Sequence, residues 1–493
     1  MNLSEEQNLA FNKFKKGQNL VITGPGGTGK SKLIKHLVNH SLLYKKKVQV
    51  TALTGCAAIL LGTAAKTIHS WAGIKTCRGE KTEIIKQAVK NKKVRNNWNS
   101  IKVLIIDEAS MMSMKMFNVL NKLAQAIRNS TDPFGGIQVV LVGDFYQLPP
   151  IETPNEPDTG MFCFESSDYF KAFPLQNHVV LKKIFRQNDP VYIKILNEIR
   201  QGELSEESKE ILKPYLKRSF NSTEHNGAIL TKLFPVRNRV DAMNKALFEE
   251  LEDAPKTYQA IHKTNNTIYI DTSKSIESDR LRECQALTMR DVENEVQMLM
   301  MNTPCIENLE LKIGAAVMCN ANIALESGIC NGTQGTIMDF VGQNPKVKFA
   351  NGIVMVMEPH HWQSEQYPTI SISQYPLQLA WALTIHKIQG TTLKMAQIDI
   401  GKDIFAYGQT YVALSRIQSL DGLYLSSFMP DRVKADPRVK DFYKKLESIE
   451  DETVDDETVD DEIIENEIVE DTTKSIFEKF ACDSTVKVIK LNK

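Results

Sequence analysis

The chain alternates between short apolar runs and longer stretches with apolar residues at helical spacing. The apolar runs begin near residues 20, 47, 103, 138, 179 and 227, and the same pattern returns after residue 377. Alternation of this kind predicts parallel strands joined by helices, and its extent predicts two such sheets. From about 310 to 368 the pattern is all-β, with turns at Asn331-Gly332 and Asn351-Gly352 that are strong hairpin signals. We therefore expect a small β-barrel inserted in the second of two α/β domains.

A glycine-rich turn follows the first apolar run and leads into a helix. Gly24, Gly29, Lys30 and Ser31 have the spacing G-x-x-x-x-G-K-[ST]. In this pattern backbone N–H groups surround phosphates, the lysine reaches the β and γ oxygens, and the serine hydroxyl binds Mg²⁺. The following helix directs its positive end at the same anions. This stretch predicts a site for a nucleoside triphosphate.

Two further strand ends carry polar side chains. The run VLIIDEAS ends in Asp107 and Glu108, where one carboxylate suits a metal-water shell and the other suits a base toward the attacking water. The run VVLVGDFYQLPP places the neutral amide of Gln147 where it can contact a γ-phosphate. Phe145 and Tyr146 in that segment either stack on nucleic-acid bases or pack against the loop. Because the acidic pair lies at a strand end downstream of the phosphate loop, each motif strengthens the prediction of a nucleotide site from the other.

The zero net charge of the chain conceals an uneven distribution. Between Glu447 and Asp471 there are 14 Asp/Glu and no Lys/Arg, whereas residues 1–446 hold 55 basic and 44 acidic residues, a net charge of +11. A basic body suits an anionic partner such as nucleic acid, although a solvated basic surface is the alternative. We expect the acidic run to be disordered.

Cysteine spacing and hydropathy argue against several classes of protein. The eight cysteines form no CxxC pair and have no His at ligand spacing, which disfavours zinc and, in so long a chain, a disulfide scaffold. The first residues contain no apolar signal sequence, and no run of about 18 apolar residues occurs. We expect a soluble intracellular protein, nuclear or cytoplasmic, without membrane contact. The Lys/Asn/Ile-rich usage would suit a large DNA virus or an organism with an AT-rich genome.

Taken in order, these motifs resemble those of the Pif1-like family of superfamily 1B DNA helicases. The matching segments, spread over residues 3–430, are LSEEQ, GPGGTGKS, TALTGCAA, TIHSWAGI, IIDEASMMS, VGDFYQLPP, LKKIFRQND, ALTIHKIQG and YVALSR. The resemblance implies two RecA-like motor domains with ATP between them, and 5′-to-3′ movement on single-stranded DNA. It also implies duplex or forked DNA as a substrate and a monomeric motor. A protein partner for the acidic tail is a further expectation.

The resemblance assigns roles to residues at the matching positions. Those that would contact ATP are Gln7, Gly24, Pro25, Gly26, Gly27, Thr28, Gly29, Lys30 and Ser31, and those that would hold Mg²⁺ are Ser31 and Asp107. Those that would carry catalysis are Lys30, Glu108 as the base, Gln147 as the γ-phosphate sensor, and Arg186 and Arg416 as arginine fingers from the second motor domain. Those that would contact DNA are Thr54, Thr67, His69, Phe145, Thr384, His386 and Lys387, with Phe145 or Trp71 stacking on bases. Leu53 and Ile388 depart from the common residues of the family, which bears on DNA contact rather than on catalysis.

The resemblance also divides the chain into domains. Motor domain 1A would span 1–180, with 74–100 as a small 1B insertion that splits strands. Motor domain 2A would span 181–305 and 369–445, interrupted by an SH3-like 2B insertion at 306–368. The acidic segment at 446–471 and a tail at 472–493 would follow. Two alternatives stay open: a DNA-binding clamp that ATP switches without unwinding, and a 1B motor of the RecD2 or Dda type.

Overall fold

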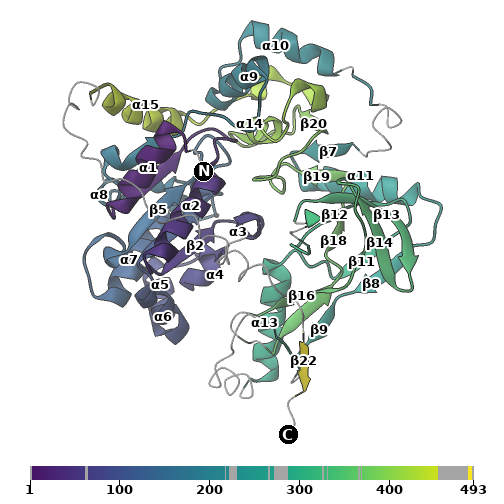
Figure 1. The fold of residues 1–493 in the computed structure, drawn as a ribbon, viewed down its shortest axis with the longest axis horizontal. Helices are drawn as coiled ribbons and strands as arrows, with labels where there is room; N and C mark the ends of the chain where they lie inside the picture. Colours follow the sequence, from purple (N-terminus) through teal and green to yellow (C-terminus); the bar gives the residue numbers. More distant parts are fainter. Residues whose placement is uncertain are drawn as a thin grey trace, which may run out of the picture. The chain divides into compact units, whose positions relative to one another are not determined.

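The chain forms two compact units in the computed structural model. The residues that the structure describes are 3–61, 65–216, 218–220, 230–264, 267–270, 287–324, 327–329, 331–364, 367, 369–452 and 487–490. The first unit comprises Met1–Glu250, Cys330–Gly332 and Leu379–Glu452, and the second comprises Leu251–Ile329, Thr333–Gln378 and Thr453–Lys493. Figure 1 shows both units, with many of their helices and strands labelled.

A six-stranded parallel sheet, in the order β3-β2-β4-β5-β1-β6, lies in the first unit. Its strands are β1 (Leu20–Thr23), β2 (Val48–Ala52), β3 (Lys66–Thr67), β4 (Val103–Asp107), β5 (Gln138–Val142) and β6 (His178–Val180). The helices joining them are α1 (Glu5–Lys15), α2 (Lys30–Leu43), α3 (Gly55–Leu61), α4 (Ile68–Ala72), α5 (Lys81–Lys90), α6 (Lys92–Ser100), α7 (Met114–Arg128) and α8 (Tyr169–Ala172). The apolar run that begins near residue 179 forms only a short strand, β6, which ends at Val180.

Helices cover both faces of this sheet. Successive residues of a strand point to opposite faces, so Leu104 and Ile106 join one core and Val103 and Ile105 join the other. Helices α1 and α2 pack on one face, and α5, α6 and α7 pack on the other. The inner side of the lysine-rich stretch 74–100 belongs to this core, since Trp98 is completely buried. Coverage on both faces explains why the strands read as unbroken apolar runs.

The predicted second parallel sheet is also present in the first unit, in the order β19-β7-β20-β21. Its strands are β7 (Thr231–Phe234), β19 (Ala382–Thr384), β20 (Ala396–Ile400) and β21 (Leu423–Phe428). The helices of this part are α9 (Pro190–Gln201), α10 (Glu206–Leu212), α11 (Arg237–Glu249) and α14 (Gln409–Leu414). Short 3₁₀ helices in the unit are η1 (Ala109–Met111), η2 (Pro133–Gly136), η3 (Pro157–Thr159), η4 (Cys163–Glu165), η5 (Leu175–Asn177), η6 (Lys213–Leu216), η8 (Leu420–Gly422) and η9 (Pro430–Arg432).

The helix α15 (Pro437–Glu452) returns from the second sheet to the core of the first. Val439, Phe442 and Tyr443 are buried in that core, and the ring of Phe442 lies 6.2 Å from the ring of Tyr169 on α8. In Figure 1 the yellow-green α15 accordingly lies close to α8. The acidic segment predicted to be disordered from 446 is helical as far as Glu452, and the rest of it lies outside the described residues.

The second unit is built mainly from antiparallel strands. A five-stranded sheet has the order β15-β14-β13-β12-β18, and a three-stranded sheet has the order β16-β17-β9. The strands are β8 (Lys256–Gln259), β9 (Ile261–Lys263), β10 (Thr267–Ile270), β11 (Asn308–Leu311), β12 (Ala316–Cys319), β13 (Gln334–Val341), β14 (Asn344–Phe349), β15 (Val354–Val356), β16 (His360–Gln363), β17 (Ser371–Gln374), β18 (Leu377–Leu379) and β22 (Lys487–Lys490). One helix, α13 (Met289–Asn302), packs against β17 through Val296 and Leu299.

One of the two predicted hairpin turns is correct. Asn351-Gly352 joins β14 to β15, and Gly352 has φ +88°. Asn331-Gly332 does not close a tight hairpin, because β12 ends at Cys319 and its partner β13 starts only at Gln334. The tight hairpin joins β13 to β14 at Gly342, which the sequence pattern did not mark. The unit that holds these strands begins at Leu251.

Candidate nucleotide and DNA site

The glycine-rich turn joins β1 to α2 and fits closely against the chain that follows β6. Gly24 has φ +135°, and a Cβ on it would lie 2.2 Å from the carbonyl oxygen of Leu181. Gly29 has φ +81° and precedes the first residue of α2, Lys30. Only glycine adopts such backbone angles without strain. The turn therefore exposes backbone N–H groups at the start of a helix, as a phosphate site requires.

The ammonium of Lys30 lies inside this turn. Its Nζ donates to the carbonyl oxygens of Gly24 at 2.6 Å and Pro25 at 2.8 Å. Burial lowers the pKa of Lys30 to about 8, while the charges of Asp144 and Glu108 act in the opposite direction. With this pKa, Lys30 is mostly protonated at pH 7 and can bind phosphate oxygens.

The amide of Gln7 supports the turn. Its Oε1 accepts the N–H of Ser4 at 3.1 Å, which completes a capping box at the start of α1. Its Nε2 donates to the carbonyl oxygen of Thr28 at 3.1 Å. Gln7 is 5% exposed, and a Cβ on Gly29 would lie 2.9 Å from its Nε2. Gln7 thus joins α1 to the turn, and its predicted contact with adenine stays a prediction.

The acidic pair lies at the end of β4, the strand two places from β1 in the sheet. Burial, together with the neighbouring charge of Glu108, raises the pKa of Asp107 to about 7. Its Oδ1 accepts the N–H of Glu108 at 2.8 Å, which opposes the shift. A buried carboxylate with a raised pKa is stabilised by a nearby cation, so Asp107 fits the role of a metal ligand. Glu108 has φ +58°, and its Oε2 accepts from Gln389 Nε2 at 2.9 Å.

Gln147 lies in the segment after β5 that packs on the start of α14. Its N–H donates to the Asp144 carbonyl oxygen at 2.9 Å, and its side chain is buried. Gly408 precedes α14 with φ +70°, and a Cβ on it would lie 2.3 Å from the carbonyl oxygen of Tyr146 and 2.6 Å from that of Gln147. The predicted sensor segment is therefore in direct backbone contact with the helix that leads to Arg416.

The structure brings the two predicted arginine fingers together at the glycine-rich turn. A Cβ on Gly26 would lie 3.5 Å from both Arg186 Nη1 and Arg416 Nη2. Arg416 is 2% exposed; its Nε donates to the Val412 carbonyl oxygen at 2.9 Å, and burial together with the charge of Arg186 lowers its pKa to about 9. Arg186 Nη1 donates to the carbonyl oxygen of Ser415 at 3.0 Å. Two positive side chains converge beside Gly26 of the turn, which favours an anionic ligand there.

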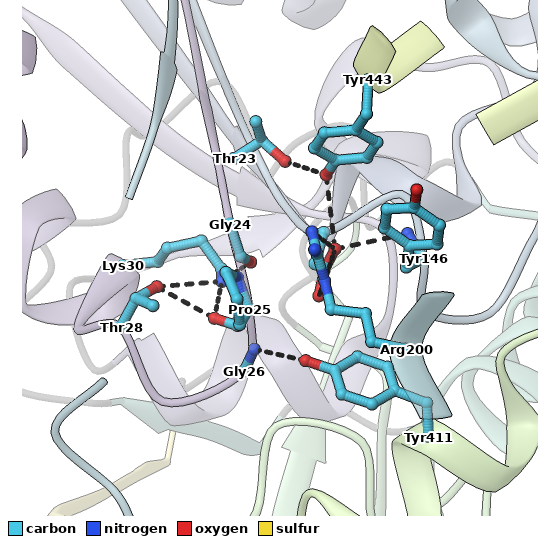
Figure 2. A network of polar contacts seen from close by, with 11 residues as sticks. Thr23, Gly24, Pro25, Gly26, Thr28, Lys30, Tyr146, Arg200, Tyr411 and Tyr443 are labelled. Carbon is cyan, nitrogen blue, oxygen red and sulfur yellow. Dashed lines mark hydrogen bonds and ion pairs between the residues drawn. The ribbon is translucent and has the colours of Figure 1, made fainter. Parts of the chain in front are cut away.

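A buried ion pair behind the turn was not anticipated from the sequence. Arg200 of α9 donates through Nε to both carboxylate oxygens of Asp144 at 3.2 Å, and through Nη2 to Oδ1 at 2.9 Å. Asp144 is fully buried and Arg200 is 10% exposed. Burial alone would raise the pKa of Asp144, but the charge and hydrogen bonds of Arg200 hold this pKa below its usual value. The guanidinium also lies over the rings of Tyr146 at 4.4 Å and Tyr443 at 5.0 Å, as Figure 2 shows.

Two tyrosines from the last part of the first unit reach the turn as well. The hydroxyl of Tyr411 accepts the N–H of Gly26 at 2.8 Å. The hydroxyl of Tyr443 hydrogen-bonds to Thr23 Oγ1 and donates to Asp144 at 3.3 Å. Figure 2 shows Tyr411 at the N–H of Gly26 and Tyr443 at Thr23, the residue of β1 that precedes the turn. These contacts join residues 385 and 420 positions apart, so no local motif could have indicated them.

The three threonines predicted to contact DNA all follow parallel strands. Thr54 follows β2, Thr67 ends β3 and Thr384 ends β19. Each hydroxyl accepts a backbone N–H from three residues ahead, that of Ala57 at 3.2 Å, Ser70 at 3.3 Å and Lys387 at 3.3 Å. These threonines are half-buried, and each begins the turn or helix that follows the carboxyl end of its strand. Ligands of open α/β sheets bind at these ends.

The two predicted histidines sit in the same turns as the threonines. Burial lowers the pKa of both His69 and His386. The ring of His386 stacks on Phe405 with centroids 5.9 Å apart, and Phe405 is 64% exposed. With lowered pKa values these histidines are mostly neutral at pH 7, so they can offer a ring face or a neutral N–H rather than a positive charge.

The prediction that Phe145 or Trp71 stacks on bases is wrong. Phe145 is 1% exposed and packs edge-on against Phe162, Phe164 and Phe442 at centroid distances of 6.4, 5.2 and 5.2 Å. Trp71 is 3% exposed, with its ring 4.7 Å from that of Trp98. Both rings complete the first core, so neither face is free for a base.

Comparison with known proteins places this geometry in a family. Residues 2–210 match the family model described as PIF1-like helicase, and residues 296–340 match the DNA helicase Pif1 2B domain. The ATP-dependent DNA helicase PIF1 of Danio rerio is 35% identical over 449 residues, covering 90% of this chain. The present chain spans 64% of the length of that relative.

Solved structures agree with the sequence comparison. The Pif1 helicase of Candida albicans has a TM-score of 0.74 and 33% identity, over 90% of this chain and 100% of that one. A Bacteroides Pif1 helicase in complex with ADP-AlF3 and single-stranded DNA has a TM-score of 0.62 and 26% identity, over 91% of this chain and 98% of that one. In the described part of the present chain, no helix has the length and apolarity needed to cross a bilayer.

Proposed function

Because this chain belongs to the PIF1-like helicase family, we propose that it is an ATP-dependent DNA helicase that moves 5′ to 3′ on single-stranded DNA and unwinds duplex or forked DNA. The observation that carries this proposal is the convergence of Arg186 and Arg416 on Gly26. Arg416, which follows α14 of the second sheet, thereby adds a positive charge to the phosphate site of the first sheet. Binding and hydrolysis of ATP at such a site can move the two sheets toward and away from each other, and a motor needs this movement.

The residues around the turn fit a nucleoside triphosphate with Mg²⁺. Ser31 at the start of α2 and Asp107 at the end of β4 would hold the metal, which when bound would neutralise charge on the phosphates. The raised pKa of Asp107 is consistent with a buried carboxylate that a cation stabilises. Lys30 would bind the β and γ oxygens through the ammonium now held by Gly24.

Catalysis would be divided among four further side chains. Glu108 would accept a proton from the attacking water, and Gln147 would contact the γ-phosphate. Arg186 and Arg416 would stabilise negative charge in the transition state, as arginine fingers do. Glu108→Gln should therefore lower hydrolysis to a small residual rate while ATP and DNA still bind.

DNA contact would fall on Thr54, Thr67, His69, Thr384, His386 and Lys387. Hydroxyls, neutral rings and backbone N–H groups at strand ends suit the sugar-phosphate backbone rather than base edges. Binding would be tolerant of sequence and would weaken steeply with salt, because phosphate contacts release counterions. The helix YIKILNEIRQGEL, which resembles the family's signature helix, forms most of α9 and supplies Arg200.

We further propose that the first sheet is motor domain 1A and the second sheet is motor domain 2A. Helices α5 and α6 within 74–100 would form the 1B wedge that separates strands. The second unit would hold the 2B element, which we expect to be SH3-like, and the 2B match at 296–340 falls within it except for residues 330–332. A monomeric motor acting in DNA replication, repair or recombination follows from the family.

The experiment that tests this proposal is strand displacement with ATP and Mg²⁺. Duplexes with a 5′ or a 3′ single-stranded overhang are compared, and Lys30→Ala serves as the control that binds DNA without hydrolysing ATP. Unwinding from the 5′ overhang alone, lost in Lys30→Ala, is the expected result. Unwinding from the 3′ overhang would refute the polarity. DNA-stimulated ATP hydrolysis without unwinding of either duplex would favour an ATP-switched clamp or translocase.

A further inference from the structure

The turn that carries three predicted DNA contacts also reaches the candidate base. Thr384, His386 and Lys387 belong to this turn, and Gln389 comes two residues later. The Nε2 of Gln389 donates to Oε2 of Glu108 at 2.9 Å, across 281 positions of sequence. Gln389 is 6% exposed, so water has little access to its amide.

Successive hydrogen bonds hold this turn together as one piece. The N–H groups of Lys387, Gln389 and Thr391 each donate to the carbonyl oxygen three residues earlier, at 3.0, 3.3 and 3.0 Å. Ile385 and Ile388 are 0% and 1% exposed and anchor the turn in the core. A force on the DNA-facing side chains therefore acts on the amide of Gln389 as well.

The side chain of Glu108 makes no capping hydrogen bond to the 3₁₀ helix that follows it. The φ of Glu108, +58°, is uncommon for a residue with a Cβ. Within the part of the chain that the structure describes, Gln389 is the side chain that hydrogen-bonds to this carboxylate. A carboxylate that must face one water molecule requires such a partner, because a small misplacement of a reacting group lowers rates strongly.

We propose that Gln389 is a positioning residue that orients Glu108 and links the DNA-contact turn to ATP hydrolysis. The inference rests on the proposed function, since it takes Glu108 as the base. DNA held by Thr384 and Lys387 steadies the turn, and the turn steadies Glu108 through the amide of Gln389. Hydrolysis is then fastest when the strand is bound.

Two substitutions test this role. Gln389→Glu keeps the shape of the side chain but replaces the donor with an acceptor, and Gln389→Ala removes the contact. Both should lower kcat at saturating single-stranded DNA by about tenfold or more, since hydrogen bonds to charged groups are strong. The KM for ATP and the DNA concentration that gives half-maximal stimulation should stay within about twofold, because Gln389 would touch neither ligand.

A matched control and a double-mutant cycle separate positioning from a general structural effect. Gln397→Glu places the same new charge at a half-buried position on β20, in the sheet that also contains β19, the strand before the turn. This control should keep the wild-type kcat. In a Glu108→Gln background, Gln389→Ala should cause no further loss in single-turnover hydrolysis, because it acts through Glu108. A merely structural residue would lower the rate again in that background.

The outcomes separate failure of this inference from failure of the proposed function. Wild-type kcat in both Gln389 variants, or an equal loss with and without Glu108, overturns the role of Gln389 while wild-type unwinding still supports the helicase. Wild-type protein that hydrolyses ATP without any DNA stimulation overturns the proposed function, and the inference is then overturned with it.

Discussion

The buried ion pair between Asp144 and Arg200 should dominate the stability of the first unit. Replacing Arg200 with Met removes three hydrogen bonds to Asp144 and leaves a carboxylate without its cation in a site that is fully buried. Met has a similar reach and can lie against the rings of Tyr146 and Tyr443 as the Arg200 side chain does, so the change is mainly electrostatic. Removing one partner of a buried pair typically costs about 3–5 kcal/mol. At about 2 °C per kcal/mol for a large unit, Tm should fall by about 6–10 °C.

The dependence of this loss on pH gives a sharper test. In the wild type Arg200 lowers the pKa of Asp144, so the pair stabilises the fold above the unfolded pKa, and this stability is lost as pH falls through the folded pKa. In Arg200→Met burial raises that pKa above its unfolded value, so the variant loses stability as pH rises. The difference in Tm between wild type and variant should therefore be larger at pH 8 than at pH 5.

Thermal unfolding followed by circular dichroism at both pH values measures this effect. Lys194→Met on the same helix serves as the control, because its exposed pair with Glu207 should contribute little and Tm should stay near that of the wild type. The double variant Asp144→Asn/Arg200→Met should recover much of the loss, since it carries no unpaired charge. An Arg200→Met protein with the wild-type Tm at both pH values would refute the reasoning.

Three further predictions concern single side chains. Phe145→Ala should destabilise the fold by about 3–5 kcal/mol in denaturant titrations but leave affinity for single-stranded DNA unchanged in fluorescence anisotropy, because the ring is in the core; weaker DNA binding by folded protein would restore the stacking role. Tyr411→Phe should lower the KM for ATP by about two- to tenfold, because the Gly26 N–H no longer gives up a hydrogen bond to bind phosphate; a raised KM would contradict this. Gly408→Ala should reduce DNA-stimulated ATP hydrolysis, because its Cβ would lie 2.3 Å from the Tyr146 carbonyl oxygen and displace α14. The control Gly17→Ala, with φ +78° and open space around it, should cost about 1 kcal/mol of stability and no activity. Equal ATP hydrolysis by the two variants would show that the position of α14 does not affect hydrolysis.

Local chemistry made parts of this site predictable. The spacing of Gly24, Gly29 and Lys30 implies a turn that only glycine can form, and the structure places Lys30 inside it. The acidic pair was located because an apolar strand ends at Asp107. The family resemblance added Arg186 and Arg416, which converge on Gly26 although 230 residues separate them. No local pattern in either segment indicates that meeting.

Contacts between distant segments account for what the sequence did not reveal. Phe145 follows a strand just as a base-stacking residue would, and only the return of Phe442 to the same core decides its orientation. Arg200 looks like a surface residue of an amphipathic helix until Asp144 is placed beside it. The turn at Asn331-Gly332 has hairpin chemistry, but its flanking strands stand too far apart along the chain. Periodicity reports which face of an element is buried, and it carries no information about which partner buries it.

The position of α15 has a consequence for the synthesis of the chain. Its side chains Val439, Phe442 and Tyr443 fill the core of the sheet that begins at Leu20. A ribosome therefore releases the whole first sheet, the second sheet and the second unit as far as Gln378 before the helix that completes the first core has been made. Until then Phe145 and Phe164 lack the ring of Phe442 that packs against them. The nascent protein should expose this aromatic surface during translation, and chaperones that bind apolar segments should engage it there.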